Sequence, residues 1–237
     1  MRRDESARAL PGEKTCILRH LPPEPRHIID VGCGDGHFAY CLSQAFPQAR
    51  VLAIDGDREY VRQARGTYQS DNLRFEHGYI SELEGAGFDL VVFSEVIEHL
   101  PNVGRNLDAI NRVTIDGGHL MLSTDNAFSL DSLSTHLYHA LHKGQPYLCL
   151  WHHQDRYYWW NHHLYAWTLH TLGTLLNLYG FSLEDYWFAN HYRTRGVRTR
   201  AQDLISTLVP AFRRKVIGRF RKVGGPTIVE RPADEGP

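Results

Sequence analysis

The sequence has no long hydrophobic run and few cysteines. No apolar stretch in its 237 residues approaches the roughly 20 residues that a membrane-spanning helix needs. No hydrophobic segment follows the charged start Met-Arg-Arg, so we expect no signal peptide. The four cysteines (Cys16, Cys33, Cys41 and Cys149) lack the spacing of a metal site. These absences favour a cytoplasmic protein with reduced thiols.

Net charge is also nearly absent, but only as an average over the chain. The formal net charge is −1, from 26 Lys and Arg against 27 Asp and Glu. Ten of the basic residues and one acid lie between Arg193 and Lys222, which gives this segment +9 (10 − 1) and the remainder −10 (16 − 26). A segment of that charge favours an anionic partner.

The stretch from Ile28 to Ala39 joins a short apolar strand to three alternate glycines and a helical pattern. Gly32, Gly34 and Gly36 let the backbone approach a ligand, and the helix that follows presents its positive N-terminal end there. The spacing differs from the Gly-x-Gly-x-x-Gly of dinucleotide sites, because the third glycine comes one residue early. Asp30, at the strand end, would repel a pyrophosphate and attract an ammonium group. The pattern predicts a site for a cationic small molecule.

Strand and helix patterns alternate along the chain, which predicts an α/β fold with a doubly wound, mostly parallel sheet. We expect strands at 28–31, 50–54, 73–77, 88–94, 119–123, 181–188 and 225–230, with a turn at 116–118. We expect helices at about 5–20, 38–46, from 58, at 106–113, 130–142, 167–179 and 202–220.

We expect residues 1–237 to form one domain, with a core at about 15–127 and 162–230 and an insertion at about 128–161. Eight of the fifteen histidines lie between His136 and His170, among many aromatic residues. This composition favours a lid over a substrate. An aromatic cluster that packs on the sheet, or a homodimer contact, is the alternative.

Asp55 ends the second strand, about 20 residues past the glycine turn. An acid at that distance can accept hydrogen bonds from ribose hydroxyls. The alternative is that Asp55 only caps the helix that starts near Arg58.

With Asp-x-Gly-x-Gly-x-Gly intact, the segment Asp30–Gly36 resembles motif I of class I S-adenosylmethionine-dependent methyltransferases. The resemblance covers about residues 15–190 and implies a seven-stranded Rossmann-like sheet. The cofactor contacts that it implies are Asp30, Gly32, Cys33, Gly34, Asp35, Gly36, Asp55, Gly56, Tyr79, Ile80, Ser94 and Glu95. The chain departs from the family in two places. Tyr79 or Ile80 replaces an acid that often contacts adenine, and Thr124-Asp125-Asn126 stands where Thr-Pro-Asn is frequent.

Glu95, Glu98 and His99 follow the fourth strand, where doubly wound folds place their sites. If a helix begins at Glu95, these side chains share one face. Two carboxylates and an imidazole suit a divalent cation. The alternatives are that His99 acts as a general base without metal, or that the acids only favour a helix N-terminus.

Glu95-Val-Ile-Glu-His99, followed downstream by His163-Leu-Tyr-Ala-Trp-Thr168, is similar to metal-dependent small-RNA 3′-terminal 2′-O-methyltransferases. Related Glu-x-x-Glu-His motifs occur in ubiquinone-pathway O-methyltransferases. The resemblance implies Glu95, Glu98, His99 and His163 as ligands. A set of carboxylates and imidazoles suits magnesium, manganese, iron, cobalt or zinc, of which we expect magnesium or manganese. We expect Glu95, Glu98 and His99 to be the catalytic residues. Ala166 replaces an acid of the RNA pattern.

Three functions remain open from the sequence. The first is S-adenosylmethionine-dependent O-methylation of a hydroxyl on a small-molecule, sugar or lipid-linked acceptor. The second is RNA 3′-terminal 2′-O-methylation, and the third is a non-catalytic cofactor-binding module. The basic helix expected within 201–222 would pack on its own sheet, or alternatively contact phosphates or an anionic membrane surface.

Overall fold

The computed structural model describes residues 10–85, 87–143, 163–190 and 204–228. They form one seven-stranded sheet in the order β3-β2-β1-β4-β5-β7-β6. All neighbouring strands are parallel except β7, which runs antiparallel to both β5 and β6. The strands are β1 (His27–Val31), β2 (Arg50–Asp55), β3 (Leu73–His77), β4 (Phe88–Ser94), β5 (Thr114–Asp125), β6 (Phe181–Ala189) and β7 (Lys215–Lys222). The predicted α/β, mostly parallel seven-stranded fold is confirmed.

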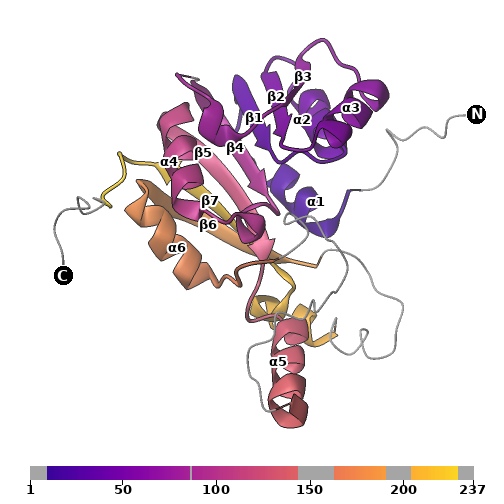
Figure 1. The fold of residues 1–237 in the computed structure, drawn as a ribbon, viewed down its shortest axis with the longest axis vertical. Helices are drawn as coiled ribbons and strands as arrows, with labels where there is room; N and C mark the ends of the chain where they lie inside the picture. The colour runs from indigo at the N-terminus through magenta and orange to yellow at the C-terminus, as the bar shows by residue number, and fades with distance from the viewer. Residues whose placement is uncertain (1–9, 86, 144–162, 191–203, 229–237) are drawn as a thin grey trace, which may run out of the picture.

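Helices cover both faces of the sheet (Figure 1). The α-helices are α1 (Gly12–Arg19), α2 (His37–Ala45), α3 (Arg58–Thr67), α4 (Val103–Val113), α5 (Leu130–Lys143) and α6 (Leu169–Leu178), and short 3-10 helices are η2 (Ile80–Glu82), η3 (Ile97–His99) and η5 (Pro210–Phe212). Side chains of α1, α2 and α3 pack on one face, and those of α4 and α6 pack on the other. The layered arrangement buries the central strands, whose apolar runs predicted a sheet covered on both sides.

The two central parallel strands end at the same edge of the sheet. Ile28 of β1 pairs with Leu90 of β4, and three of the last four residues of β4 are fully buried apolar residues. Polar residues that follow these strands therefore emerge next to each other at the carboxyl edge. That is where parallel α/β sheets hold their ligands.

The predicted helix at 202–220 is wrong. Residues 204–208 are helical, but Pro210 begins η5, and the chain then enters β7 at Lys215. Proline cannot continue a helix, because it lacks the N–H and clashes with the preceding turn. Val216 and Phe220 fit a helical stripe, yet they are also an even number of residues apart and share one face of a strand. A continuous amphipathic helix is therefore absent from residues 204–222, and Val216 and Phe220 are buried in the sheet.

Three smaller boundaries also differ from the predictions. The first described helix begins at Gly12, after Pro11, rather than near residue 5, and residues 5–9 lie outside the described chain. The turn expected at 116–118 lies within β5. The strand expected at 225–230 is not present at 225–228, since β7 already supplies the seventh strand, and residues 229–230 lie outside the described part.

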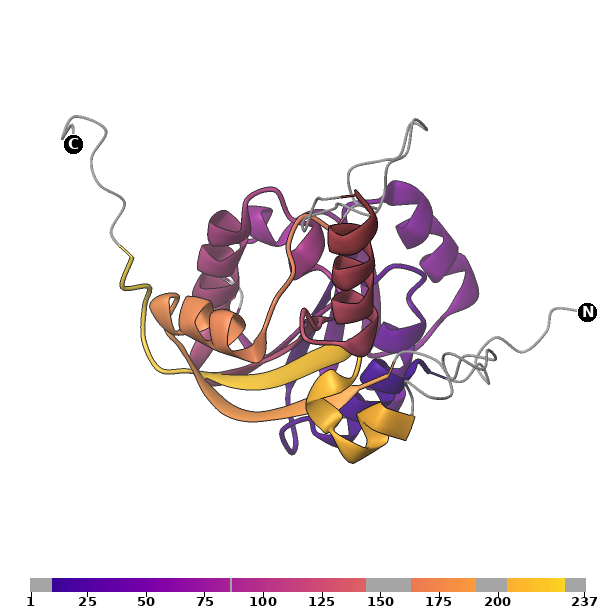
Figure 2. The same ribbon diagram turned by 90° about the horizontal axis from the view of Figure 1, so that it is seen from below.

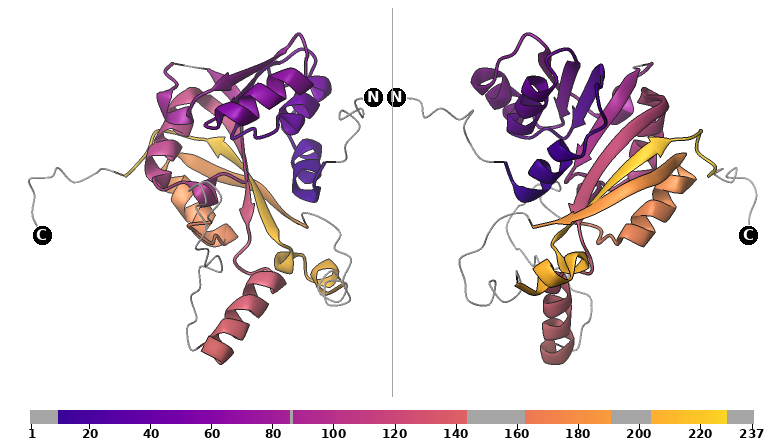
Figure 3. Two further views of the ribbon diagram at one scale, coloured as in Figure 1. Left: turned by 45° about the vertical axis from the view of Figure 1, so that its right-hand side comes forward. Right: turned by 180° about the vertical axis from the view of Figure 1, so that it is seen from behind.

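Helix α5 projects from the carboxyl edge of the sheet (Figure 3). Its first turn lies beside the 204–214 segment (Figure 2), where Arg214 Nε is 2.5 Å from Asp131 Oδ2. The predicted lid therefore begins with a helix, while its residues 144–161 lie outside the described chain. Among the described helices, none has the length and apolar character needed to cross a membrane.

Candidate functional site

The glycine turn after β1 is held against the end of β2 by backbone hydrogen bonds. The amides of Gly32 and Cys33 both donate to the carbonyl oxygen of Ile54, at 2.8 and 3.0 Å. The amide of Gly34 donates to Asp55 Oδ2 at 2.8 Å. These contacts fix the loop in an open curve around the ends of the first two strands.

Glycine is required in this loop for two separate reasons. Gly32 and Gly36 have φ of +74° and +80°, in the left-handed region that other residues avoid. A Cβ at Gly32 would lie 2.4 Å from Val96 Cγ2, and one at Gly36 would lie 2.6 Å from the Cβ of Ala64. Conformation and space therefore both exclude a side chain at these two positions.

A cavity of about 450 Å³ lies at the carboxyl edge, between the glycine loop and the segments after β2, β3 and β4. Its size is typical of a small-molecule site. The predicted site residues that line it are Gly32, Gly34, Asp35, Asp55, Gly56, Tyr79, Ile80, Glu95 and His99. Sequence reasoning missed the other lining residues, which are Val31, Ile54, Asp57, Tyr60, Gly78, Phe93, Val96, Leu100 and Asn106. Proximity along the chain to predicted residues is the signal that could have found most of them.

Several predicted cofactor residues lie behind the cavity wall rather than on it. Cys33 is buried, and burial raises the pKa of its thiol, so it remains protonated. Gly36 packs against Ala64, and the hydroxyl of Ser94 is 2.8 Å from the hydroxyl of Ser123. These residues shape the loop and the strand ends that carry the lining residues.

Asp30 is also buried behind the loop. Its Oδ2 has no hydrogen-bond partner among the described residues. Burial raises the pKa of Asp30 to about 6, Lys14 opposes the rise, and Asp55 and Asp35 add to it. A cation near the loop would stabilise the ionised form of this carboxylate.

Asp55 joins the glycine loop to the turn after β2. Its Oδ2 accepts from Gly34 N–H and its Oδ1 accepts from Asp57 N–H, both at 2.8 Å. Each carboxylate oxygen has a second lone pair that can accept from a ligand hydroxyl. The Tyr79 ring lies against Gly56, since a Cβ there would be 2.5 Å from Tyr79 Cε1. The predicted ribose and adenine residues therefore lie on one wall.

Glu95 leaves β4 in a strained conformation rather than in a helix. Its φ is +60°, and the next helical turn is η3, a short 3-10 helix that starts at Ile97. The amide of Glu95 donates to Ser123 O at 2.9 Å, and Ser123 Oγ donates to Glu95 Oε1 at 2.9 Å. Because Glu95 lies outside this helical turn, the expected single helical face of Glu95, Glu98 and His99 does not form.

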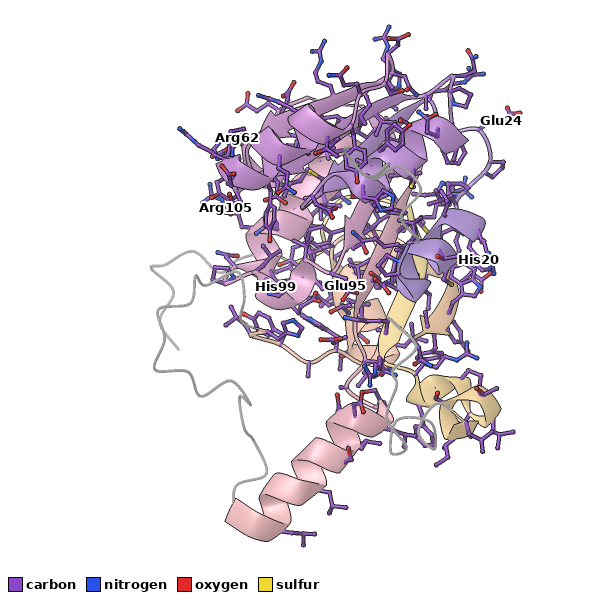
Figure 4. The ribbon with its side chains drawn as sticks, turned by 90° about the vertical axis from the view of Figure 1, so that its right-hand side faces the viewer. His20, Glu24, Arg62, Glu95, His99 and Arg105 are labelled. Carbon is purple, nitrogen blue, oxygen red and sulfur yellow. The ribbon has the colours of Figure 1, made fainter. Side chains whose placement is uncertain are left out.

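Glu98, His99 and His163 come together into one cluster. One ligand atom from each lies within 4.8 Å of the others, and the rings of His99 and His163 are 4.7 Å apart, edge to face. The backbone brings His163 here, because Leu164 N–H donates to Glu98 O at 2.7 Å. Figure 4 places Glu95 and His99 at the end of the sheet from which α5 projects.

The chemistry of this cluster fits a divalent cation. Glu98 is fully buried, its Oε2 accepts from Thr124 Oγ1 at 2.9 Å, and its Oε1 has no hydrogen-bond partner among the described residues. Burial, with a contribution from Glu95, raises the pKa of Glu98 to about 8. A buried carboxylate oxygen without a donor, beside two imidazoles, is an arrangement that a cation would stabilise. Of the four ligands implied by the resemblance, these three are brought together and Glu95 is not.

Lys215 and Asp125 also belong to the site, although the sequence analysis did not select them. Lys215 Nζ forms ion pairs with Glu95 Oε2 and with Asp125 Oδ1, the second at 2.6 Å. Asp125 Oδ2 lies 2.6 Å from His163 Nδ1. The departure from Thr-Pro-Asn at position 125 was the one available signal for Asp125. Lys215 had none, because it was assigned to a helix.

The charges in this network support one another. Burial raises the pKa of Asp125, but the hydrogen bond from His163 and the charge of Lys215 outweigh burial and lower it. Burial lowers the pKa of Lys215, but Glu95 and Asp125 outweigh burial and raise it. The hydrogen bond to Asp125 raises the pKa of His163. The network therefore holds Lys215 as a cation and Asp125 as a carboxylate.

Comparison with known families gives one match over most of the chain. A family described as "Methyltransferase domain" matches residues 6–186. The chain is 38% identical over 104 residues to trans-aconitate 2-methyltransferase of Deinococcus radiodurans, covering 44% of this chain and 39% of that protein. It is 30% identical over 119 residues to malonyl-[acyl-carrier protein] O-methyltransferase of Methylococcus capsulatus, covering 49% of this chain and 43% of that protein. The chain thus matches less than half the length of these two relatives.

Solved structures share the fold at low sequence identity. A putative methyltransferase of Haloferax volcanii, in complex with the Trm112 methyltransferase activator, superposes with a TM-score of 0.66, 15% identity and coverage of 89% and 88%. N-methyltransferase NodS from Bradyrhizobium japonicum, in complex with S-adenosyl-L-homocysteine, gives a TM-score of 0.57, 16% identity and coverage of 89% and 85%. At these identities the likeness establishes the fold alone.

Proposed function

Because the chain belongs to the family of class I S-adenosylmethionine-dependent methyltransferases, we propose that it methylates a hydroxyl oxygen of a small-molecule, sugar or lipid-linked acceptor. One observation carries the proposal. His99 lines the cavity and also belongs to the cluster with Glu98 and His163. Groups that accept a proton or hold a cation therefore stand at the edge of the cavity that would hold the methyl donor.

The residues of the cavity suit the parts of the donor, which supplies the methyl group on its sulfonium. The glycine loop would hold the cationic methionine portion, and the charge of Asp30, buried behind the loop, would favour a cation there. Asp55 would accept hydrogen bonds from the ribose hydroxyls. Tyr79 and Ile80, which line the same wall, would hold the adenine by stacking and apolar contact.

The cluster would prepare the acceptor. Methyl transfer needs the acceptor oxygen about 3 Å from the methyl carbon and a lowered affinity for its proton. Glu98, His99 and His163 would hold a divalent cation, and two imidazoles among three ligands favour manganese over magnesium. A cation bound there would lower the pKa of the acceptor hydroxyl. Without a cation, His99 at the cavity edge would accept the proton itself.

The name of one relative supports an oxygen acceptor, and the charges beside the cluster favour a neutral one. One of the matched relatives is named an O-methyltransferase. Glu95 and Asp125 keep their carboxylates near the cluster through ion pairs with Lys215, so an anionic acceptor would be repelled more than a neutral hydroxyl. In this proposal residues 1–237 act as one domain, and the insertion at 128–161, which begins with α5, closes over the acceptor.

Two measurements test the proposal. Calorimetry with S-adenosylhomocysteine should show binding, and no binding at millimolar concentration would contradict it. Radioactive methyl from S-adenosylmethionine should then pass to small-molecule or lipid extracts, and excess chelator should abolish the transfer. Full activity in excess chelator would show that no metal takes part in the reaction and would leave His99 as the general base. Label retained on RNA instead would establish the RNA 3′-terminal alternative.

A further inference from the structure

One ammonium group connects the two carboxylates nearest the cluster. Lys215 Nζ pairs with Glu95 on one side and with Asp125 on the other, and the Lys215 side chain is only 10% exposed. Lys215 enters from β7, the antiparallel strand beside β5. Asp125 is the last residue of β5 and pairs in register with Lys215, so the two strands fix the position of this ion pair.

Asp125 determines which ring nitrogen of His163 is available as a ligand. His163 Nδ1 lies 2.6 Å from Asp125 Oδ2, so this ring nitrogen carries the proton that is donated to the carboxylate. Only Nε2 of His163 then remains as an acceptor or ligand. A carboxylate that holds one ring nitrogen of a histidine is the arrangement that orients metal-binding histidines in proteins generally.

Lys215 and Ser123 occupy both oxygens of Glu95. Oε2 is paired with Lys215, and Oε1 accepts from Ser123 Oγ at 2.9 Å. Glu98, in contrast, keeps Oε1 without a donor among the described residues. The two glutamates of the Glu-x-x-Glu-His segment therefore have different surroundings, one satisfied by protein groups and one not.

We propose that Asp125 is a positioning residue that presents Nε2 of His163 to a cation, and that Lys215 keeps Glu95 out of the ligand set. The inference rests on the proposed function, because it concerns the cation of that site. It assigns three protein ligands, Glu98, His99 and His163, and leaves further positions for the acceptor oxygen and water. Asp125 can take this role because its carboxylate accepts from His163. A proline, which is frequent at this position in the resembled family, has no side-chain acceptor and could not.

The test measures binding of Mn²⁺ alone to the full chain, by calorimetry and by electron paramagnetic resonance. Asp125→Ala should weaken Mn²⁺ binding by about 10- to 100-fold. Asp125→Asn should fall between Asp125→Ala and the unaltered protein, because its Oδ1 still accepts from His163 but without the charge. Glu95→Gln should change the affinity by less than about threefold, whereas Glu98→Gln should abolish measurable binding.

Asp116→Asn is the matched control, since Asp116 lies on the same strand, is 95% exposed on its side chain and pairs only with Lys222 among described residues. It should bind Mn²⁺ as the unaltered protein does. Should Asp125→Ala not fold, the comparison of Asp125→Asn with Asp116→Asn decides the question in the same way.

The outcomes separate this inference from the proposed function. If Asp125→Ala binds Mn²⁺ as tightly as the unaltered protein, the role of Asp125 is overturned. If the alanine variant does not fold, the same result with Asp125→Asn overturns it. A loss with Glu95→Gln as large as with Glu98→Gln overturns the role of Lys215 and returns Glu95 to the ligand set. If the unaltered protein binds no Mn²⁺ at millimolar concentration, the inference fails. The proposed methyltransferase activity is then still open to its own test, which is methyl transfer with S-adenosylhomocysteine binding as the control.

Discussion

The two halves of the site are built in different ways. The glycine loop of the cavity is shaped by its backbone, with Gly32 and Gly36 in left-handed conformations and loop amides that donate to Ile54 and Asp55. The cluster beside it is formed by side chains from distant parts of the chain. Glu98 and His99 come from η3, His163 precedes α6, and Lys215 comes from β7.

The difference lies in what each half tolerates. The glycine loop depends on the few positions where no side chain fits. The side-chain cluster and the ion pairs beside it concentrate buried ionisable groups, with Glu98 at a pKa of about 8 and Lys215 held between two carboxylates. Variants in one half should therefore leave the binding function of the other half intact.

The largest effect is expected from the cluster. Glu98→Ala or His163→Ala should lower the rate of methyl transfer by at least about 100-fold, because each removes a group that lowers the proton affinity of the acceptor. Affinity for S-adenosylhomocysteine, measured by calorimetry, should stay within a few fold, since neither residue lines the cavity. Glu59→Ala, an exposed glutamate on α3, serves as the control and should retain full activity. A parallel loss of cofactor affinity would show that the two halves are not separable.

The reverse separation is expected in the glycine loop. Gly32→Ala places a Cβ 2.4 Å from Val96 Cγ2 at a φ of +74°, which costs about 1–3 kcal/mol. S-adenosylhomocysteine should bind about 10-fold more weakly or worse, while Mn²⁺ affinity should change by less than threefold. Gly66→Ala is the matched control, because that glycine lies in α3 with open space around its Cβ position. Unchanged cofactor affinity in Gly32→Ala would contradict the placement of the cofactor at this loop.

A smaller effect is expected at the adenine wall. Tyr79→Ala removes the ring that lies against Gly56 and should weaken S-adenosylhomocysteine binding by about 10-fold, a typical value for the loss of one base–aromatic contact. Tyr186→Ala, a half-exposed tyrosine of β6 outside the cavity, should not change it. Equal affinities of the two variants would remove Tyr79 from the cofactor site.

The smallest effect concerns stability and pH in the presence of chelator. The pKa of Glu98 is about 8 in the folded protein against an ordinary 4.5, so the native state binds more protons than the unfolded state between these values. The stability of the protein should therefore decrease as pH rises from about 5 to about 8. Glu98→Gln lacks this titration.

Chemical denaturation at several pH values checks this expectation. Glu98→Gln should be more stable than the unaltered protein at pH about 8 by more than about 1 kcal/mol, and the difference should shrink toward pH about 5. Glu59→Gln, whose exposed carboxylate has a pKa lowered by the hydrogen bond from Arg62, should show no such gain. Parallel stability curves for Glu98→Gln and the unaltered protein would contradict the raised pKa.

The glycine loop and Asp55 were predicted from the sequence, and the structure brings them together at one cavity. Asp30, the three alternate glycines and Asp55 are near one another along the chain, and the local rules for strands and tight turns bring them together. Those rules depend on φ, on hydrophobic periodicity and on short-range hydrogen bonds, all of which a single sequence displays. The strands β1 to β4 were predicted within one or two residues for the same reason.

The cluster was predicted only in part, because it depends on contacts across the chain. The sequence supplied Glu98, His99 and His163, but neither the positive φ of Glu95 nor the partner that occupies it. The segment that begins at Lys215 carries Val216 and Phe220 at a spacing that fits both a helix and a strand. The segment is a strand because, as β7, it pairs with both β5 and β6 and lies between them in the sheet.

What the sequence by itself determined is the α/β fold class, the glycine loop and the acids around it, because each is a short-range consequence of residue type. Only the tertiary structure decided which carboxylates, Glu95 and Asp125, form ion pairs with Lys215. Lys215, 120 residues beyond Glu95, reaches that glutamate through the pairing of β7 with β5. The ammonium group that gives Glu95 different surroundings from Glu98 is placed by a strand pairing that no local sequence pattern specifies.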